Sequence, residues 1–353
     1  MVDTVLSGGW IIDGTRTPPY QADLCIQDGK IVAISPQWEG NCRTRVDVTG
    51  KIVSPGFIDI HTHSDTCPFS AVFPESKVAQ GITLEIVGNC GVSAVPILPS
   101  CQAEQTAYLR KISEIPVPEE AVRDASVQKY AAHVAQTGYP SHLGTLIGQG
   151  TLRAGIVGFQ DRPLTPSEME QMKFLLDDQL NQGALGLSLG LIYPPGSFSP
   201  TSELRELARV VQKHKKILAV HMRNEGPNIF QAVEEMLSIA EETGVHLHIS
   251  HLKLMGKAQW GQAPRLLERI EASRQRGAVV TCDQYPYTAT STILAALLPR
   301  RAYDGGSAAM LRRVSDPDPS LLRDIAEEME RRGGADAVLV ASTHGSAPEY
   351  HGK

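Results

Sequence analysis

From residue 55 onward, apolar runs alternate with longer amphipathic stretches, and this alternation limits the folds open to the chain more than any other feature. Strands that alternate with helices are typical of βα units around a parallel sheet. The predicted strands are 57–60, 83–87, 143–147, 184–189, 217–220, 247–249 and 278–282, and the predicted helices include 166–182, 201–214, 228–243 and 264–276. Thr165 and Thr201 precede acidic first turns and are the predicted N-caps of two helices. No Gly-x-Gly-x-x-Gly follows any strand, which favours a (β/α)₈ barrel over an open doubly wound sheet.

The regions on either side of these βα units have a different character. Residues 1–54 contain short β-like runs separated by Asp-Gly pairs, which predicts a small antiparallel, β-sandwich-like domain. Residues 55–294 are the predicted barrel strands one to seven. Residues 295–353 are rich in charge and glycine and are expected to form an inserted subdomain. We assign the apolar run 337–341 to this insertion, so the chain is expected to end before barrel strand eight.

Composition and charge exclude several functional classes. The chain has 353 residues, is 42% hydrophobic and carries a formal net charge of -6, without a basic run interleaved with aromatic residues. Nucleic acid is therefore not an expected partner. No apolar run reaches the roughly 18 residues of a membrane helix, and the start of the chain lacks a signal-peptide pattern, so the expected location is the cytoplasm. The six cysteines lack paired spacing, which argues against a disulfide framework.

Side chains that bind metals recur at the ends of the predicted strands. His61 and His63 follow the first strand, Cys90 follows the second, and His221 and His251 follow the fifth and sixth. The carboxyl ends of barrel strands carry the active site, and imidazole and thiolate are zinc ligands. A single histidine at a strand end is more often structural, but the five positions together predict a metal centre. The remaining predicted structural histidines of this region are His133, His142, His214, His246 and His248.

Six motifs give the chain a resemblance to a known family. They are Gly-Phe-Ile-Asp-Ile-His-Thr-His at 56–63, Val-Gly-Asn-Cys-Gly at 87–91, Gly-Leu-Ile-Tyr-Pro-Pro-Gly at 190–196, His-Met-Arg-Asn-Glu-Gly at 221–226, Ile-Ser-His-Leu-Lys at 249–253 and Tyr-Pro-Tyr-Thr-Ala-Thr-Ser-Thr at 285–292. With these motifs the chain resembles the N-acyl-D-amino-acid deacylases (D-aminoacylases) of the amidohydrolase superfamily. Gly-Asn-Cys-Gly is the most specific of them, because His-x-His alone would indicate only the superfamily.

The resemblance implies a zinc-dependent hydrolase that cleaves an N-acyl-D-amino acid, a small molecule, to a carboxylate and a D-amino acid. It implies that Cys90, His221 and His251 bind the tight zinc ion. It also implies that His61 and His63 help to bind a second, weaker metal. Finally, it implies a substrate pocket lined by Tyr193, Tyr285 and Ser291.

The chain departs from the family pattern at its C-terminal end. The family has a catalytic aspartate in a Ser-Asp-Gly-like element at the end of strand eight, followed by an arginine for the substrate carboxylate, and neither is found here. We therefore assign no catalytic residue and expect the chain to be a truncated deacylase. Two alternatives stay open: a cyclic-amide hydrolase such as a hydantoinase or dihydroorotase, and an inactive fragment. Near the site, Arg223 and Glu225 are a candidate supporting pair, and Lys253 is expected to be an ordinary solvated lysine.

Overall fold

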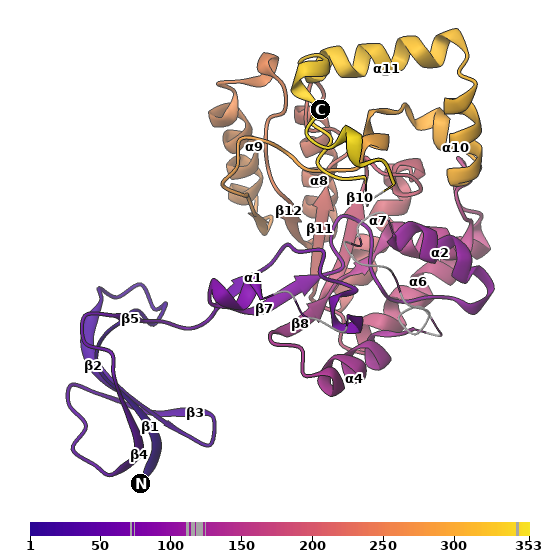
Figure 1. Cartoon of the computed structure of the whole chain (residues 1–353). Coiled ribbons are helices and arrows are strands. Elements are labelled where there is room, and N and C mark those ends of the chain that lie inside the picture. The colour runs from indigo at the N-terminus through magenta and orange to yellow at the C-terminus, as the bar shows by residue number, and fades with distance from the viewer. Residues whose placement is uncertain are drawn as a thin grey trace. The chain divides into compact units, whose positions relative to one another are not determined.

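The computed structural model describes residues 1–70, 73, 75–110, 113, 117, 123, 125–343 and 346–353. Its backbone contacts divide the chain into two compact units (Figure 1). Unit 1 comprises Met1–Phe57 with Gln80–Thr83, and unit 2 comprises Ile58–Ala79 with Leu84–Lys353. The division of residues 55–353 into a barrel and an inserted subdomain at residue 295 stays a prediction.

Unit 1 is a five-stranded sheet. Its strands are β1 (Val2–Ile11), β2 (Tyr20–Gln27), β3 (Lys30–Ser35), β4 (Cys42–Asp47) and β5 (Ile52–Val53). The strand order is β3-β2-β1-β4, and β5 also pairs with β1. The hairpin between β2 and β3 turns at Asp28 and Gly29, which have φ of 51° and 71°, as a type I′ turn requires. The predicted Asp-Gly turn is therefore confirmed here.

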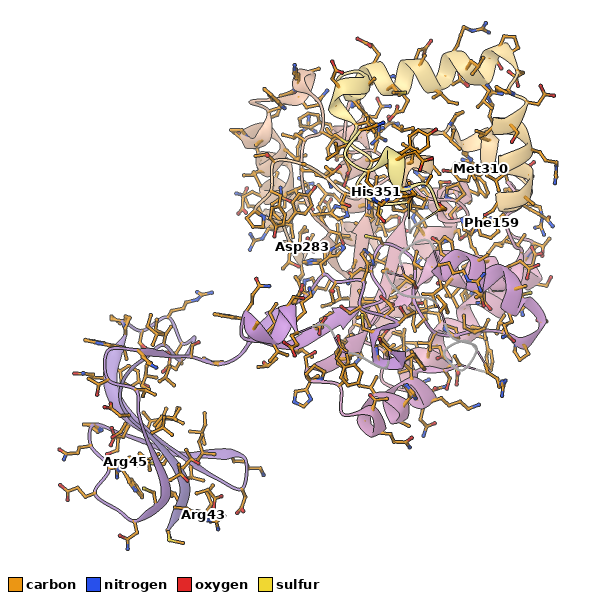
Figure 2. All side chains as sticks on the ribbon, in the orientation of Figure 1. Arg43, Arg45, Phe159, Asp283, Met310 and His351 are labelled. Carbon is orange, nitrogen blue, oxygen red and sulfur yellow. The ribbon has the colours of Figure 1, made fainter. Side chains whose placement is uncertain are left out.

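The prediction that unit 1 is antiparallel is only partly correct. The β1–β2 and β2–β3 pairs are antiparallel, but β1 pairs in parallel with both β4 and β5. Turn residues in the sequence reveal hairpins between consecutive strands and say nothing about a pair formed by a longer crossover, which explains the error. On β4, Arg45 Nη1 lies 3.4 Å from Asp23 Oδ2 on β2, so that an ion pair accompanies the unpredicted arrangement (Figure 2).

Parallel strands form the framework of unit 2. The strands are β6 (Phe57–Asp59), at the boundary with unit 1, β7 (Ile82–Val87), β8 (His142–Thr145), β9 (Ile147–Gly148), β10 (Gly186–Gly190), β11 (Ile217–His221), β12 (His246–Ile249) and β13 (Val280–Cys282). All seven predicted strands are confirmed, with the third divided into β8 and β9. One sheet has the order β6-β7-β8 and the other β13-β12-β11-β10-β9. The β7–β8 pair and every pair of the second sheet are parallel.

The helices of unit 2 cover these sheets. They are α1 (Ser76–Ala79), α2 (Gln102–Leu109), α4 (Val127–Thr137), α5 (Gln149–Ile156), α6 (Pro166–Asn181), α7 (Thr201–Lys213), α8 (Ile229–Thr243), α9 (Ala263–Gln275), α10 (Gly306–Ser315) and α11 (Pro319–Arg332). Figure 1 shows α7 and α8 beside β10, β11 and β12. Leu187, Leu218 and Leu247 on these three strands are completely buried, as expected for strands covered on both faces. Among the described helices, none has both the length and the apolar character needed to cross a membrane.

Unit 2 shows a run of βα units without evidence of closure. Within the described chain, no strand pairs with the free edge of β13 or joins it to β6. The apolar run 337–341 is not a strand. Its first residue is the last residue of the short 3₁₀ turn Ala335–Ala337, and the rest of the run is irregular chain. This agrees with its separation from the barrel strands in the sequence-based prediction.

The predicted helix starts differ in outcome. Thr165 is the N-cap of α6, where its side chain accepts a hydrogen bond from Glu168 N while the Glu168 carboxylate accepts one from Thr165 N, a complete capping box. The prediction for Thr201 is wrong, because the N-cap of α7 is Pro200 and Thr201 is the first helical residue. The Thr201 hydroxyl instead donates to Glu235 Oε1 at 2.7 Å.

We expect Thr165→Ala to lower the free energy of unfolding of unit 2 by about 1 kcal/mol, because it leaves the N–H of Glu168 without its acceptor. Urea denaturation followed by circular dichroism measures the change. Thr106→Ala is the matched control, since it makes the same chemical change inside α2, where the hydroxyl has no hydrogen-bond partner within the described chain. Equal losses in the two variants would contradict the capping role of Thr165.

Candidate metal centre

The candidate ligands follow strands of two sheets: β6 and β7 are neighbours in one sheet, and β11 and β12 are neighbours in the other. His61 follows β6 by two residues, Cys90 follows β7 by three, His221 ends β11, and His251 follows β12 by two. The carboxyl ends of parallel strands lie at the same edge of a sheet, so side chains far apart in the sequence meet there. All of these residues belong to unit 2.

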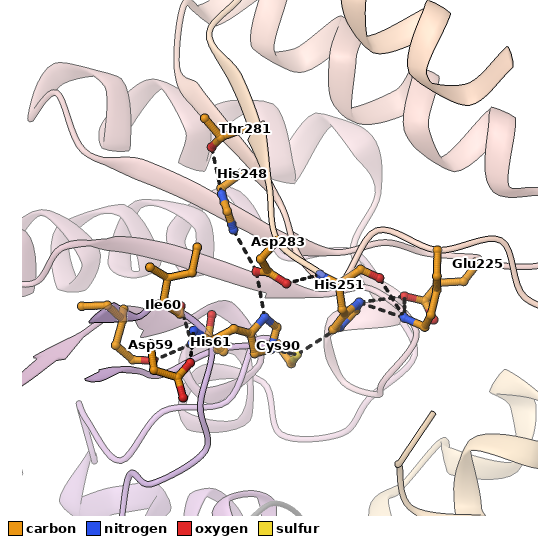
Figure 3. A network of polar contacts seen from close by, with 12 residues as sticks. Asp59, Ile60, His61, Cys90, Glu225, His248, His251, Thr281 and Asp283 are labelled. Atoms are coloured by element: carbon orange, nitrogen blue, oxygen red, sulfur yellow. Dashed lines mark hydrogen bonds and ion pairs between the residues drawn. The ribbon is translucent and has the colours of Figure 1, made fainter. Parts of the chain in front are cut away.

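The thiol of Cys90 is the meeting point of the cluster. Its Sγ lies 3.3 Å from His61 Nε2 and 3.6 Å from His251 Nε2 (Figure 3). The three side chains form a group whose potential ligand atoms all lie within 4.8 Å of one another. Cys90 and His251 are buried, at 6% and 9% exposed. The sequence-based prediction that these three residues converge is therefore correct in geometry.

The other two predicted histidines complete the cluster. The His221 ring lies 4.4 Å from the His251 ring, and the His63 ring lies 5.7 Å from the His61 ring, measured between centroids. Within the described chain, neither nitrogen of His221 nor Nδ1 of His63 has a hydrogen-bond partner, although these atoms are buried. Buried polar atoms normally have a partner, so these nitrogens have unused capacity to bind a ligand.

The electrostatics of the cluster favour a thiolate among imidazoles. Burial alone would raise the pKa of Cys90, but the surrounding rings of His221, His251, His61 and His63 hold it well below its usual value. Burial alone would lower the pKa of His61, but Asp283 and Cys90 raise it to about 10. A bound divalent cation would take the place of the imidazole protons that surround the thiolate, because metal ligands bind in their deprotonated form.

The backbone is unusual at two of the candidate ligands. Cys90 and His251 have φ of 53° and 38°, a region that residues other than glycine seldom adopt outside functional sites. The loop around Cys90 also requires two glycines. Gly88 and Gly91 both have φ of 77°, and a Cβ at Gly91 would lie 2.5 Å from Gly190 N. The Gly-Asn-Cys-Gly motif thus allows the thiol to approach the neighbouring strands closely.

Two carboxylates lie beside the cluster: Asp283, which was assigned no role from the sequence, and Glu225, which was predicted to be a supporting residue paired with Arg223. Asp283 Oδ2 accepts from His61 Nδ1 at 3.1 Å, and Glu225 Oε1 lies 2.9 Å from His251 Nδ1. Lys253 Nζ donates to Glu225 Oε1 at 2.6 Å. Burial raises the pKa of Glu225, but His221, His251 and Lys253 outweigh it and lower the pKa to about 2. In the sequence, the position of Asp283 just after strand seven is the one feature that could have indicated its place beside the cluster.

Two of the expectations for neighbouring residues are wrong. Arg223 does not pair with Glu225; its Nε and Nη2 each lie 3.1 Å from the carboxylate oxygens of Glu235, on α8. Lys253 is not a solvated lysine, because its side chain is only 12% exposed and it binds Glu225. Both errors concern partners chosen by tertiary packing, which sequence spacing does not define.

The predicted pocket residues are only partly brought together. The Tyr193 ring lies 4.9 Å from the His221 ring, and its hydroxyl lies 2.8 Å from the hydroxyl of Thr292. The Tyr285 Oη is buried and has no hydrogen-bond partner in the described chain, while Lys253 Nζ lies 5.6 Å from its ring. Ser291 is exposed, and the adjacent Thr292 makes the contact with Tyr193. The role of Ser291 stays a prediction.

The donor set fits a zinc ion. It contains one thiolate and imidazoles, the ligands that zinc prefers, and several imidazole nitrogens that are free to coordinate. The same set would suit other soft or borderline divalent ions. The six cysteines all lie in the described chain and none of them forms a disulfide, so the Cys90 thiol is available to a metal.

Comparisons with known proteins agree with this geometry. A D-aminoacylase of Alcaligenes xylosoxydans xylosoxydans is 36% identical over 292 residues, which cover 83% of this chain and 59% of the relative. An N-acyl-D-glutamate deacylase of the same organism is 35% identical over 343 residues, or 96% of this chain and 67% of the relative. No family model matches the chain.

A solved structure shows the same fold. The N-acyl-D-glutamate deacylase from Bordetella bronchiseptica, in complex with zinc and a phosphonate inhibitor, superimposes with a TM-score of 0.75 and 37% sequence identity. The match covers 83% of this chain and 60% of that structure, so this chain spans less than two thirds of the length of that protein and of the matched D-aminoacylase. The extent and identity of these matches show that the chain belongs to the D-aminoacylase family of amidohydrolases.

Proposed function

We propose that this chain carries the metal centre and part of the substrate pocket of a zinc-dependent hydrolase. The reaction is that of an N-acyl-D-amino acid with water to give a carboxylate and a D-amino acid. The observation that carries the proposal is the position of Cys90 Sγ, 3.3 Å from His61 Nε2 and 3.6 Å from His251 Nε2. Family membership supports the linear-amide reaction over cleavage of a cyclic amide. We also propose that the parallel strands of unit 2 belong to a (β/α) barrel.

Five residues would hold the metal. We assign Cys90, His221 and His251 to the tight zinc ion, and His61 and His63 to a second, weaker ion. Bound zinc lowers the pKa of a coordinated water towards ~7 and polarises a carbonyl group. Cys90 Sγ lies near both His61 Nε2 and His251 Nε2, so the thiolate would be within reach of an ion held by either ring.

The chain's own residues prepare the site for the substrate. The Tyr285 hydroxyl is buried without a partner in the described chain and is available to donate a hydrogen bond to a substrate oxygen. Tyr193 lies against His221, where its hydroxyl and that of Thr292 can bind a carboxylate. We assign no proton transfer to Asp283, because it already accepts hydrogen bonds from His61, His248 and the His251 backbone.

Glu225 lies between the cluster and a neighbouring cavity. Glu225 lines a cavity of about 230 Å³ together with Ile192, Asn224 and Met255. The Glu225 carboxylate binds Lys253 and the His251 ring, so it orients a candidate ligand and also faces space that a small molecule can enter. This cavity is our candidate for the place where part of the substrate binds.

Metal analysis and an activity assay test the proposal. We expect the purified chain to bind zinc and, once loaded, to hydrolyse N-acetyl-D-methionine faster than the metal-stripped chain, with no activity on the L enantiomer. Activity on hydantoin instead would favour a cyclic-amide hydrolase. Bound zinc without turnover of either substrate would reduce the proposal for this polypeptide to metal binding, and no bound zinc would reject it.

A further inference from the structure

Asp283 lies directly after β13 and joins three elements of the site. Its Oδ2 accepts hydrogen bonds from His61 Nδ1 at 3.1 Å and from His248 Nε2 at 2.9 Å. Its Oδ1 accepts one from the backbone N–H of His251 at 2.5 Å. Figure 3 shows Asp283 joined to both His61 and His248. The Asp283 side chain is only 14% exposed. One carboxylate therefore contacts one candidate ligand through its ring and another through its backbone.

These contacts define which nitrogen of His61 carries a proton. An ionised carboxylate only accepts hydrogen bonds, so the Nδ1 that faces Asp283 must be the donor. In the neutral ring, with its proton held on Nδ1, the lone pair of Nε2 points toward Cys90, 3.3 Å away. His251 is not defined in the same way, because both Glu225 Oε1 and Lys253 Nζ lie within 3.0 Å of its Nδ1.

His248 holds Asp283 from the opposite side. The β12–β13 register places His248 directly beside Thr281, and the Thr281 hydroxyl lies 2.8 Å from His248 Nδ1. If Nε2 donates to Asp283, Nδ1 must accept from Thr281, so each group in this sequence has a defined role. The sequence analysis predicted a structural role for His248 and did not predict its contact with Asp283.

We propose that Asp283, supported by His248 and Thr281, is a positioning residue that fixes the ring and the tautomer of His61 so that Nε2 faces the metal centre. The inference rests on the proposed function for its effect on metal binding. Partners of this kind behind a ligating histidine typically contribute about 10- to 100-fold to metal affinity. Asp283, His248 and Thr281 thus contribute to the affinity of the centre for a metal ion through His61.

Asp283→Asn is the variant that tests the proposal. The amide keeps the size of the carboxylate but replaces one accepting oxygen with a donating NH₂ group. In one orientation the NH₂ group faces the His251 N–H; in the other it faces His61 and His248, which would have to reverse their tautomers. We expect the affinity for Zn²⁺, measured by competition with a chromophoric chelator, to fall about 10- to 100-fold.

Nitrogen-15 NMR of the histidine rings supplies a readout that does not depend on a metal. In the metal-free wild-type chain, at a pH high enough for the His61 ring to be neutral, we expect its one proton on Nδ1, and in Asp283→Asn we expect this proton to move or to become distributed over both nitrogens. The signals are assigned with a His61→Gln spectrum. If the wild-type chain binds no zinc, the proposed function fails, while these spectra still decide the positioning role.

Two further variants make the outcome decisive. Asp177→Asn changes a similar carboxylate–imidazole pair away from the cluster, with Asp177 Oδ1 2.8 Å from His214 Nε2, and should change neither zinc affinity nor the His61 spectrum. Thr281→Val removes only the hydroxyl behind His248 and should cause a smaller loss, below about 10-fold. It decides the question if Asp283→Asn does not fold. An unchanged His61 tautomer in a folded Asp283→Asn protein would overturn the inference. Where only Thr281→Val folds, a zinc affinity equal to that of the wild-type chain would overturn it.

Discussion

Cys90→Ala is expected to abolish tight zinc binding by this chain. The substitution removes the one thiolate of the cluster, toward which the Nε2 atoms of both His61 and His251 are directed. Loss of a ligand must cost more than loss of a group that merely orients one, and the latter is typically about 10- to 100-fold. We therefore expect the zinc affinity to fall by more than about 100-fold. Equilibrium dialysis followed by elemental analysis measures the bound metal.

The control for Cys90→Ala is a cysteine elsewhere in unit 2. Cys67 is buried but does not belong to the cluster, so Cys67→Ala should retain the zinc content of the wild-type chain. Cys90→Ser adds a stricter comparison, because a hydroxyl has nearly the shape of the thiol but does not ionise at neutral pH. Wild-type zinc content in a folded Cys90→Ala protein would refute the assignment of Cys90 as a ligand.

The sequence predicts the strands and the cluster well for a shared physical reason. Strands of a parallel sheet are short apolar runs, and the residues that follow them lie at the carboxyl ends of those strands, where active sites form. Finding His61, Cys90, His221 and His251 after such runs was therefore sufficient to predict that they converge. Their order along the chain did not matter, because the strand neighbours place them together.

The groups that support the candidate ligands could not be predicted in the same way. Arg223 is two residues from Glu225 in the sequence, yet it contacts Glu235. The reason is that Glu225 already binds Lys253 and His251. Asp283 finds His61 across 222 positions of sequence. Such choices depend on rotamers and on competition between several partners in three dimensions. Residue type and spacing along the chain do not predict which partner is contacted.

The second large effect is expected for Arg153, a completely buried arginine on α5. Its Nη1 lies 2.5 Å from Glu203 Oε2 on α7, and its Nη2 donates to the backbone carbonyl of Arg162 at 2.8 Å. The two charged side chains are 0% and 3% exposed. Arg153→Ala leaves the Glu203 carboxylate buried without its cation, so we expect a loss of about 3–5 kcal/mol in the free energy of unfolding. Urea denaturation of unit 2, followed by tryptophan fluorescence and by circular dichroism, measures this loss.

Two comparisons separate the buried charge from the lost packing. Arg209→Ala removes an arginine that pairs with Glu242 while 50% exposed, and it should cost no more than about 1 kcal/mol. The double variant Arg153→Met with Glu203→Gln replaces both charges, and the new amide can still hydrogen-bond to Gln149 and Ser199, the present partners of the Glu203 carboxylate. It should therefore be more stable than Arg153→Ala, because replacing a buried ion pair by neutral groups of similar size is often nearly neutral. If the double variant is as unstable as Arg153→Ala, the loss comes from packing around α5 and not from the uncompensated carboxylate of Glu203.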